Sequence, residues 1–182
     1  MKLIFATTNE DKIKEAKYAL GIEIEGTPLE IEEIQSLDPE KVALQKAQDY
    51  YDQLKEPLFI EDVALTFHAL GKLPGTYISD FVKNLQPEGL CELLRDKKDR
   101  SATALTTLVY MDSNGEPHIF TGEVKGYIST EPRGNNGFAF DFIFIPEDET
   151  RTFGEMTLEE KNKYSMRTRA LKNMKAWLDT QK

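Results

Sequence analysis

The sequence has very little cysteine and no long apolar segment. Cys91 is the one cysteine in 182 residues, which excludes a disulfide within the chain. No run of about 18 consecutive apolar residues occurs, and the apolar run at the N-terminus is too short for a signal peptide. We therefore expect a protein without membrane association, located in the cytoplasm.

An excess of basic residues is also missing. The formal net charge is -9 at pH 7, which argues against nucleic acid as a partner, because neutralising a phosphate backbone requires a basic face. An anionic small molecule remains compatible with this charge if Lys and Arg gather locally. Hydrophobic residues make up 40% and charged residues 30%, which is typical of a globular protein of one domain.

The first chemically suggestive segment is the polar turn TTNEDK. Residues 2–7 have the composition of a buried strand, and apolar residues at helical spacing predict a helix from Asn9 to Leu20. A turn between a strand and a helix presents backbone N–H groups and the positive helix end, which suits phosphate. The turn contains no glycine, so it is neither a Walker loop nor a dinucleotide fingerprint. Thr7, Thr8 and Asn9 also fit simple helix capping.

The segment LFIED, residues 58–62, places two acids directly after a short buried strand. In open α/β sheets ligands lie beyond the carboxyl ends of strands, where Glu61 and Asp62 could hold a metal ion or activate water. The alternative is that both acids end the strand and face solvent.

Alternation of the remaining segments predicts an α/β fold. We expect a second strand over residues 22–34, helices over 39–54, 78–85 and 87–95, and a β-hairpin of 102–111 and 118–124 around DSNGEP. Strand–helix alternation followed by a hairpin predicts a mixed central sheet flanked by helices. The hairpin would belong to a second lobe of the single domain 1–182, with a cleft between the lobes.

The segment RGNNGFAFDFIFIP, residues 133–146, is predicted to become a strand with its phenylalanines on one face. Asp141 would then lie in mid-strand, where a buried carboxylate requires a donor from the protein or from a ligand. TLEE at residues 157–160 has the form of a capping box, and the helical region after it is expected to reach about Leu178. Lys and Arg off its apolar stripe are ordinarily solvated.

Five segments, taken in order, resemble motifs of the inosine triphosphate pyrophosphatase family, which hydrolyses deaminated purine nucleoside triphosphates. TTNEDK resembles T-x-N-x-x-K, IEDVAL resembles E-D-[ST]-x-L, and LPGTY resembles P-G-x-Y. GFAFD resembles G-F-x-[FWY]-D, and GEMTLEEKNKYSMR resembles A-E-M…E-K-N…S-H-R. Each motif alone is weak, but five at compatible spacings over nearly the whole chain argue against coincidence.

The resemblance implies a role for each matching residue. The triphosphate would be bound by Thr7, Asn9, Lys12, Lys46 and Lys161. A divalent cation, Mg²⁺, would be held by Glu33, Glu61 and Asp62, since carboxylates are its preferred protein ligands. Asp62 would also position or deprotonate the attacking water, so that a monophosphate and pyrophosphate are released.

The resemblance also implies a site for the base. Phe138 and Phe140 would clamp it, and Asp141, Ser165 and Arg167 would recognise it. A 6-oxo purine offers an acceptor at O6 and a donor at N1, and adenine presents the reverse pattern, so a matched site disfavours adenine. Asp141 could meet the base directly or hold Arg167.

Three departures bear on the substrate. Met166 replaces the histidine of S-H-R, Val63 and Ala64 follow the acid pair, and Ser79 and Asp80 lack the basic residue common after P-G-x-Y. The first hypothesis is hydrolysis of ITP, dITP and XTP. The alternatives are a pyrophosphatase with relaxed or shifted base specificity and a nucleotide-binding protein without turnover. The resemblance implies a homodimer.

Overall fold

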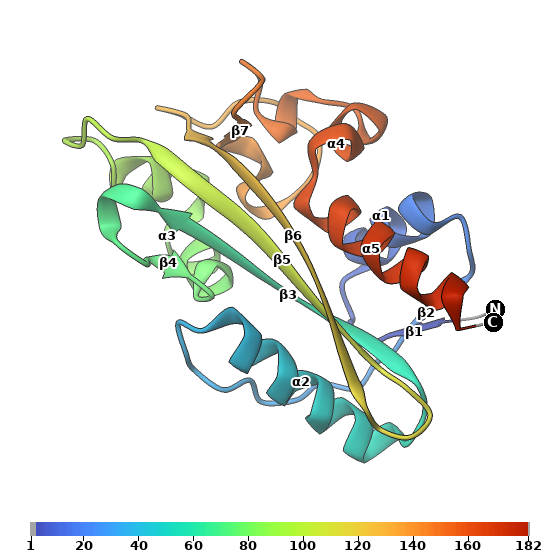
Figure 1. Cartoon of the computed structure of the whole chain (residues 1–182). Coiled ribbons are helices and arrows are strands. Elements are labelled where there is room, and N and C mark those ends of the chain that lie inside the picture. Colours follow the sequence, from blue (N-terminus) through green and yellow to red (C-terminus); the bar gives the residue numbers. More distant parts are fainter. Residues whose placement is uncertain (1–2, 182) are drawn as a thin grey trace. The chain divides into compact units, whose positions relative to one another are not determined.

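The computed structural model describes residues 3–181 (Figure 1). The chain forms two compact units. The first unit comprises the described residues of Met1–Asp62, Thr106–Gly122 and Met166–Lys182. The second unit comprises Val63–Leu105 and Glu123–Ser165. The helices are α1 (Glu10–Leu20), α2 (Pro39–Leu54), α3 (Ile78–Glu92), α4 (Leu158–Tyr164) and α5 (Met166–Thr180). The strands are β1 (Leu3–Phe5), β2 (Ile24–Gly26), β3 (Leu58–Phe67), β4 (Pro74–Gly75), β5 (Ser101–Met111), β6 (Pro117–Ile128) and β7 (Phe144–Pro146).

A mixed sheet of seven strands confirms the predicted fold class. Its order is β2-β1-β3-β5-β6-β7, with β4 paired to β3. β1 is parallel to both β2 and β3, in a register that sets Ile4 opposite Leu58 and Phe5 opposite Phe59. β3–β4 and β6–β7 are antiparallel. Mixed pairing of this kind follows from crossover helices early in the chain and a hairpin later.

Successive strand residues of the first unit point to opposite faces of the sheet, and each face is buried in a hydrophobic core. On one face Phe5 and Phe59 stack at 4.3 Å and join a core with residues of α1 and α5. On the other face Leu58 and Ile60 join a core with Ala43 of α2. Figure 1 shows α2 on one side of the strands and α1 and α5 on the other. The helices expected over 9–20 and 39–54 are therefore confirmed, and each buries one face against the sheet.

Two strand predictions in the first unit need correction. β2 covers only Ile24–Gly26, and residues 27–36 form no regular element. β3 does not end at the acid pair: it continues through Glu61 and Asp62 to Phe67. The strand continues because VALTF supplies β-branched and apolar residues, and because Glu61 pairs with Arg167 and Lys12 inside the protein. Lys2, the expected start of β1, lies outside the described residues.

The hairpin is confirmed, with its turn and the adjoining Thr106–Gly122 in the first unit and the remainder of both strands in the second. Its turn follows from DSNGEP. The Asp112 carboxylate accepts backbone N–H groups from Asn114 at 2.7 Å and Glu116 at 3.0 Å. Gly115 has a φ of 79°, a conformation that glycine adopts without steric cost. The two helices expected over 78–95 are joined in α3 across a kink at Gln86. A proline at position 87 removes a helical N–H donor there, which accounts for the break.

In the second unit the strand predicted over 133–146 is wrong. Residues Ala139–Phe142 form a short 3-10 helix, and only Phe144–Pro146 is a strand. Gly137 has a φ of 79°, and the Asp141 carboxylate accepts the Phe138 N–H at 2.9 Å, so a local turn competes successfully with strand pairing.

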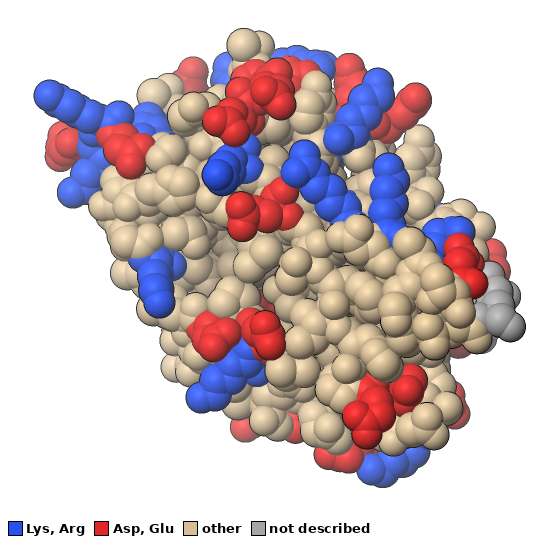
Figure 2. All heavy atoms as spheres, in the orientation of Figure 1, with Lys and Arg blue, Asp and Glu red and all other residues tan. Residues whose placement is uncertain are grey.

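The visible face of the chain is mixed in charge. Figure 2 shows Lys and Arg side chains lying among Asp and Glu side chains on this face. Among residues 3–181, no helix is both long and apolar enough to cross a membrane. The predicted cleft between lobes and the single-domain assignment stay predictions.

Candidate active site

The two adjacent acids of β3 are buried and point to opposite faces of the sheet. Glu61 has 2% and Asp62 8% of its surface exposed. Because strand side chains alternate, Glu61 shares the face of Phe59, towards α1 and α5, whereas Asp62 shares the face of Ile60, towards α2. One two-residue motif therefore supplies carboxylates to two different environments.

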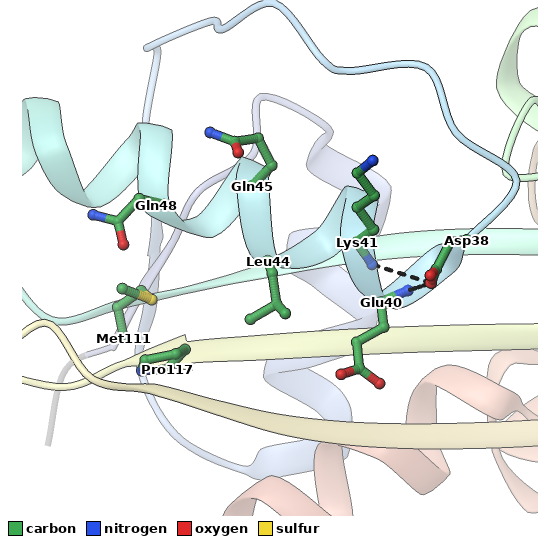
Figure 3. Close-up of a pocket in the computed structure, with 8 residues that line it drawn as sticks. All are labelled: Asp38, Glu40, Lys41, Leu44, Gln45, Gln48, Met111 and Pro117. Carbon is green, nitrogen blue, oxygen red and sulfur yellow. Dashed lines mark hydrogen bonds between the residues drawn. The ribbon is translucent and has the colours of Figure 1, made fainter.

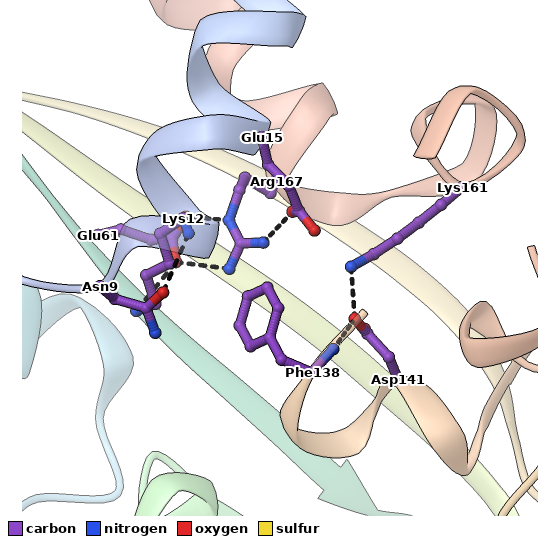
Figure 4. Close-up of polar contacts among 8 residues, drawn as sticks. All are labelled: Asn9, Lys12, Glu15, Glu61, Phe138, Asp141, Lys161 and Arg167. Carbon is purple, nitrogen blue, oxygen red and sulfur yellow. Dashed lines mark hydrogen bonds and ion pairs between the residues drawn. The ribbon is translucent and has the colours of Figure 1, made fainter. Parts of the chain in front are cut away.

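Glu61 lies in a buried cluster of four charged side chains (Figure 4). Arg167, from the first turn of α5, donates from Nε to Glu61 Oε2 at 2.6 Å and from Nη2 to Oε1 at 2.9 Å. Its Nη1 donates to Glu15 of α1. Lys12, one turn before Glu15, pairs with Glu61 Oε1 at 3.2 Å. Two carboxylates and two cations balance one another, which is what allows charged groups to remain buried.

The cluster fixes its own protonation states. Burial raises the pKa of Glu61, but the positive charges of Arg167 and Lys12 outweigh burial and lower that pKa from 4.5 to about 2. Burial lowers the pKa of Arg167, and Glu61 and Glu15 more than offset this, so the pKa lies above its usual value. Glu61 and Arg167 are therefore both charged throughout the neutral range.

Close backbone packing determines how deeply α5 enters the first unit. A Cβ added at Gly122 of β6 would lie 2.7 Å from Ala170 N and 2.9 Å from Arg169 Cβ, and closer still to Met166 O. Because two of these atoms belong to the backbone of α5, glycine is required for this approach. Gly122 thereby helps to place Arg167, the second residue of α5.

Asp62 has the opposite electrostatic environment to Glu61. Burial raises its pKa from 3.8 to about 6, an effect that the charge of Lys46 opposes and that of Glu33 reinforces. Its Oδ2 has no hydrogen-bond partner among the described residues. A buried carboxylate with an unpartnered oxygen and a pKa near neutrality is suited to accept a proton or to ligate a cation.

The polar turn after β1 has the geometry of a phosphate-binding turn. Asn9 caps α1, accepting the Lys12 N–H at 3.1 Å, and Thr7 Oγ1 accepts the Asn9 N–H at 3.1 Å. The turn thus orders the positive end of an 11-residue helix beside the Lys12 ammonium group. These contacts also satisfy the capping alternative, and phosphate binding remains a prediction for Thr7, Asn9 and Lys12.

The predicted metal ligands Glu33, Glu61 and Asp62 are not gathered as a group of three. Within residues 3–181 no three His, Cys, Asp or Glu side chains form a cluster that could hold a metal ion. Both oxygens of Glu61 already accept from Arg167. Glu33 is 47% exposed in its side chain and pairs with Lys46 of α2. Asp62 could ligate a cation with its unpartnered oxygen, and Glu33 could do so because its side chain is exposed. Glu61 does not suit a cation, because both of its oxygens already accept hydrogen bonds.

The second unit holds a separate group of predicted site residues. Lys161 of α4 donates to Asp141 Oδ2 at 2.7 Å, and its Nζ lies 5.2 Å from the centre of the Phe138 ring (Figure 4). Asp141 and Lys161 are 4% and 3% exposed, so the expectation that helix-face Lys is solvated is wrong here. Within this unit the donor that satisfies Asp141 is Lys161, together with the Phe138 N–H.

The expected pairing of Phe138 with Phe140 on one strand face is wrong. Phe140 lies in the short helix, is 6% exposed and packs edge-on against Phe144 at 6.3 Å, whereas Phe138 is half-buried. Ser165, expected within one long helix, instead separates α4 from α5 with extended ψ of 130°. Base contacts by Phe138, Phe140 and Ser165 stay predictions.

Sequence reasoning missed Glu15. Its signal was its position three residues after Lys12 and next to the buried Ala16, which places a carboxylate on the inner side of α1. The structure also contains a pocket of about 600 Å³ that holds none of the predicted site residues (Figure 3). It is lined by Asp38, Glu40, Lys41, Leu44, Gln45, Gln48, Met111 and Pro117.

Comparison with known proteins identifies the family. The sequence matches the profile of the Ham1 family over residues 3–177. The chain belongs to the Ham1 family. The dITP/XTP pyrophosphatase of Thermococcus kodakarensis is 44% identical, with 98% of this chain and 97% of that protein covered. The inosine triphosphate pyrophosphatase of Kluyveromyces lactis is 36% identical over 97% of this chain and 95% of that protein.

Solved Ham1 structures have the same fold. The Ham1 protein of Coxiella burnetii aligns with a TM-score of 0.85 at 32% identity and covers 99% of each chain. The Ham1 protein of Staphylococcus aureus aligns with a TM-score of 0.85 at 25% identity and covers 100% of each chain. Ham1 membership confirms the resemblance drawn from the five motifs and the α/β fold class.

Proposed function

We propose that this Ham1-family chain hydrolyses deaminated purine nucleoside triphosphates, namely ITP, dITP and XTP, to the monophosphate and pyrophosphate. The proposal is carried by one observation: Asp62, in a chain with full-length pyrophosphatase relatives, is buried and has an unpartnered carboxylate oxygen. Its pKa of about 6 leaves it mostly ionised at neutral pH and able to take a proton from water.

The phosphates would be bound by the turn after β1 and by lysines. Thr7 and Asn9 order the start of α1, and the side chains of Lys12 and Lys46 are partly buried, at 21% and 13% exposed. Ammonium groups suit phosphate oxygens as point charges. We assign Lys161 of the second unit to the same task, which its family motif supports.

A divalent cation, Mg²⁺, would be held by Asp62 and Glu33. Such an ion, when bound, polarises a phosphate and offsets the charge that develops as the phosphoanhydride breaks. The residues of the chain do the remaining work: Asp62 holds the water and accepts its proton, and the lysines orient the phosphates.

By their family motifs, Arg167 of the first unit is assigned to base discrimination, and so are Asp141 and Phe138 of the second unit. Two carboxylates fix the Arg167 guanidinium, so its donors are directed before substrate arrives. Met166, which replaces the family histidine, is 2% exposed, so we infer that a base contact from this position uses the backbone. The same resemblance assigns Ser165 and Phe140 of the second unit to the base.

The test is pyrophosphate release from ITP, XTP, ATP, GTP, dTTP and UTP, each with and without Mg²⁺. The proposal predicts selective release from ITP and XTP that requires Mg²⁺ and is lost in Asp62→Asn, while this variant still binds ITP. Equal rates on all six substrates would refute base recognition, and tight ITP binding without release would indicate a nucleotide-binding protein. Sedimentation of the purified protein would test the proposed homodimer.

A further inference from the structure

The Glu61 carboxylate is shared between two cationic side chains from different helices. Its Oε2 accepts from Arg167 Nε at 2.6 Å. Its Oε1 accepts from Arg167 Nη2 at 2.9 Å and also pairs with Lys12 Nζ at 3.2 Å. α1 and α5 pack against one another in the first unit, so the carboxylate lies where the two helices present their cations to β3.

We propose that Glu61 is a positioning residue that couples Arg167 to Lys12, and that it is not a ligand of the catalytic cation. The proposal rests on the proposed function in assigning Arg167 to the base and Lys12 to the phosphates. It changes the role that the acid pair suggests in sequence, where Glu61 and Asp62 look equivalent.

The geometry argues against metal ligation by Glu61. Its side chain is 1% exposed and its two oxygens face a guanidinium and an ammonium group. A divalent cation at the same oxygens would be repelled by both charges at short range in a poorly solvated site. Withdrawing Glu61 to ligate an ion would also leave the buried Arg167 with Glu15 as the remaining carboxylate of the cluster. Asp62, on the opposite face of β3, has neither obstacle.

The shared oxygen gives the coupling a physical basis. If phosphate draws the Lys12 ammonium group away from Oε1, the carboxylate loses one positive neighbour and its interaction with the Arg167 guanidinium strengthens. In turn, a nucleobase that holds Arg167 in one position also holds the Glu61 carboxylate bonded to it, and this carboxylate sets the position of Lys12. Such coupling is reciprocal between the two ligands.

Two measurements on the whole protein test the proposal. The first is independent of activity: an Arg-selective ¹H–¹⁵N spectrum records the Arg167 Nε–H signal, assigned by its loss in Arg167→Lys. Lys12→Ala is expected to shift this signal, because Glu61 relays the change. Lys46→Ala, which removes a lysine of α2 in the same unit, is the matched control and is expected to leave it in place. An unmoved signal in Lys12→Ala would overturn the coupling.

The second measurement uses Glu61→Gln, which keeps the side-chain size and removes the charge. We expect the ratio of kcat/KM for ITP to that for ATP to fall about tenfold or more, while the Mg²⁺ concentration for half-maximal rate stays unchanged. By calorimetry without metal, pyrophosphate is expected to strengthen IMP binding in the wild type and not in the variant. An unchanged substrate ratio with a raised Mg²⁺ requirement would show a metal ligand and overturn the proposal.

A variant that fails to fold leaves the proposal testable. Glu61→Asp keeps the charge, which preserves the balance of the cluster, but its shorter side chain cannot reach both cations, so it is expected to lose the IMP–pyrophosphate coupling as well. Retained coupling in Glu61→Asp would overturn the proposal. If the wild type releases no pyrophosphate from ITP, the proposed function fails, whereas the Lys12→Ala spectrum still decides whether Glu61 links the two cations.

Discussion

Asp62→Asn is expected to make the protein more stable at alkaline pH while it abolishes turnover. Burial raises the folded-state pKa of Asp62 from 3.8 to about 6, so the native state binds this proton more tightly than the unfolded chain does. Its favourable contribution to stability is complete below pH 3.8 and is lost as the pH rises through about 6. At pH 8 the ionised carboxylate therefore costs free energy on folding.

The size of this effect follows from the shift in pKa. A rise of about two units at 1.36 kcal/mol per unit corresponds to about 3 kcal/mol at pH 8. At pH 4 the same arithmetic leaves about 0.5 kcal/mol, since the native carboxyl is then protonated and the unfolded one is only partly ionised. A neutral amide of similar shape avoids the cost of burying the charge, so Asp62→Asn should raise the free energy of unfolding by up to these amounts.

Urea unfolding at pH 8 and pH 4, followed by circular dichroism, measures the difference. Asp96→Asn is the control, because Asp96 is exposed and its neutralisation should change stability by less than about 0.5 kcal/mol at either pH. If Asp62→Asn is no more stable than the wild type at pH 8, the claim that the buried, ionised Asp62 carboxylate destabilises the folded protein is refuted.

Three further predictions concern the same unit. The rate of ITP hydrolysis should rise with pH as Asp62 ionises, because the ionised carboxylate is the form that accepts the proton of water, and a rate that falls across pH 5–7 in a stopped assay would contradict its role as the base. Arg167→Leu should lower the free energy of unfolding by about 3 to 5 kcal/mol, because buried carboxylates lose their partner; urea unfolding tests this against exposed Arg169→Leu, and equal losses would be inconsistent with it. Gly122→Ala should lower the ITP-to-ATP ratio of kcat/KM about tenfold by displacing α5, and an unchanged ratio would exclude this route.

Much of the fold could be predicted from sequence because its local signals agree with its tertiary structure. Asp38 before Pro39 caps α2, accepting two backbone N–H groups, and Thr157 with Glu160 forms the capping box of α4. DSNGEP specified the hairpin turn in the same way, through Asp112 and Gly115. Where capping and turn residues coincide with apolar periodicity, sequence alone is informative.

The errors arose where long-range pairing or a local turn overrides composition. LFIED looked like a strand end because two acids are unfavourable inside a sheet, and Glu61 is acceptable there because it pairs with Lys12 and with Arg167, which is 106 residues away. The alternating phenylalanines of GFAFDFIF favoured a strand, but the Asp141 carboxylate accepts hydrogen bonds from the Phe138 N–H and from Lys161. Glu15 was missed since its partner is 152 residues away.

The division of labour between Glu61 and Asp62 also follows from geometry that sequence cannot give. Adjacent strand residues alternate in direction, but only the arrangement of helices says which face holds cations and which holds an unpartnered oxygen. The motif predicted that two acids matter; the structure assigns one to Arg167 and Lys12 and the other to the environment of Lys46.

The most direct test of the central claim is a competition experiment. Equimolar ITP and ATP are incubated together with the protein and Mg²⁺, and the products are followed by ³¹P NMR and chromatography. The account predicts that IMP and pyrophosphate appear in equal amounts while ATP persists. Formation of IDP and inorganic phosphate, or consumption of ATP at the rate of ITP, would contradict it.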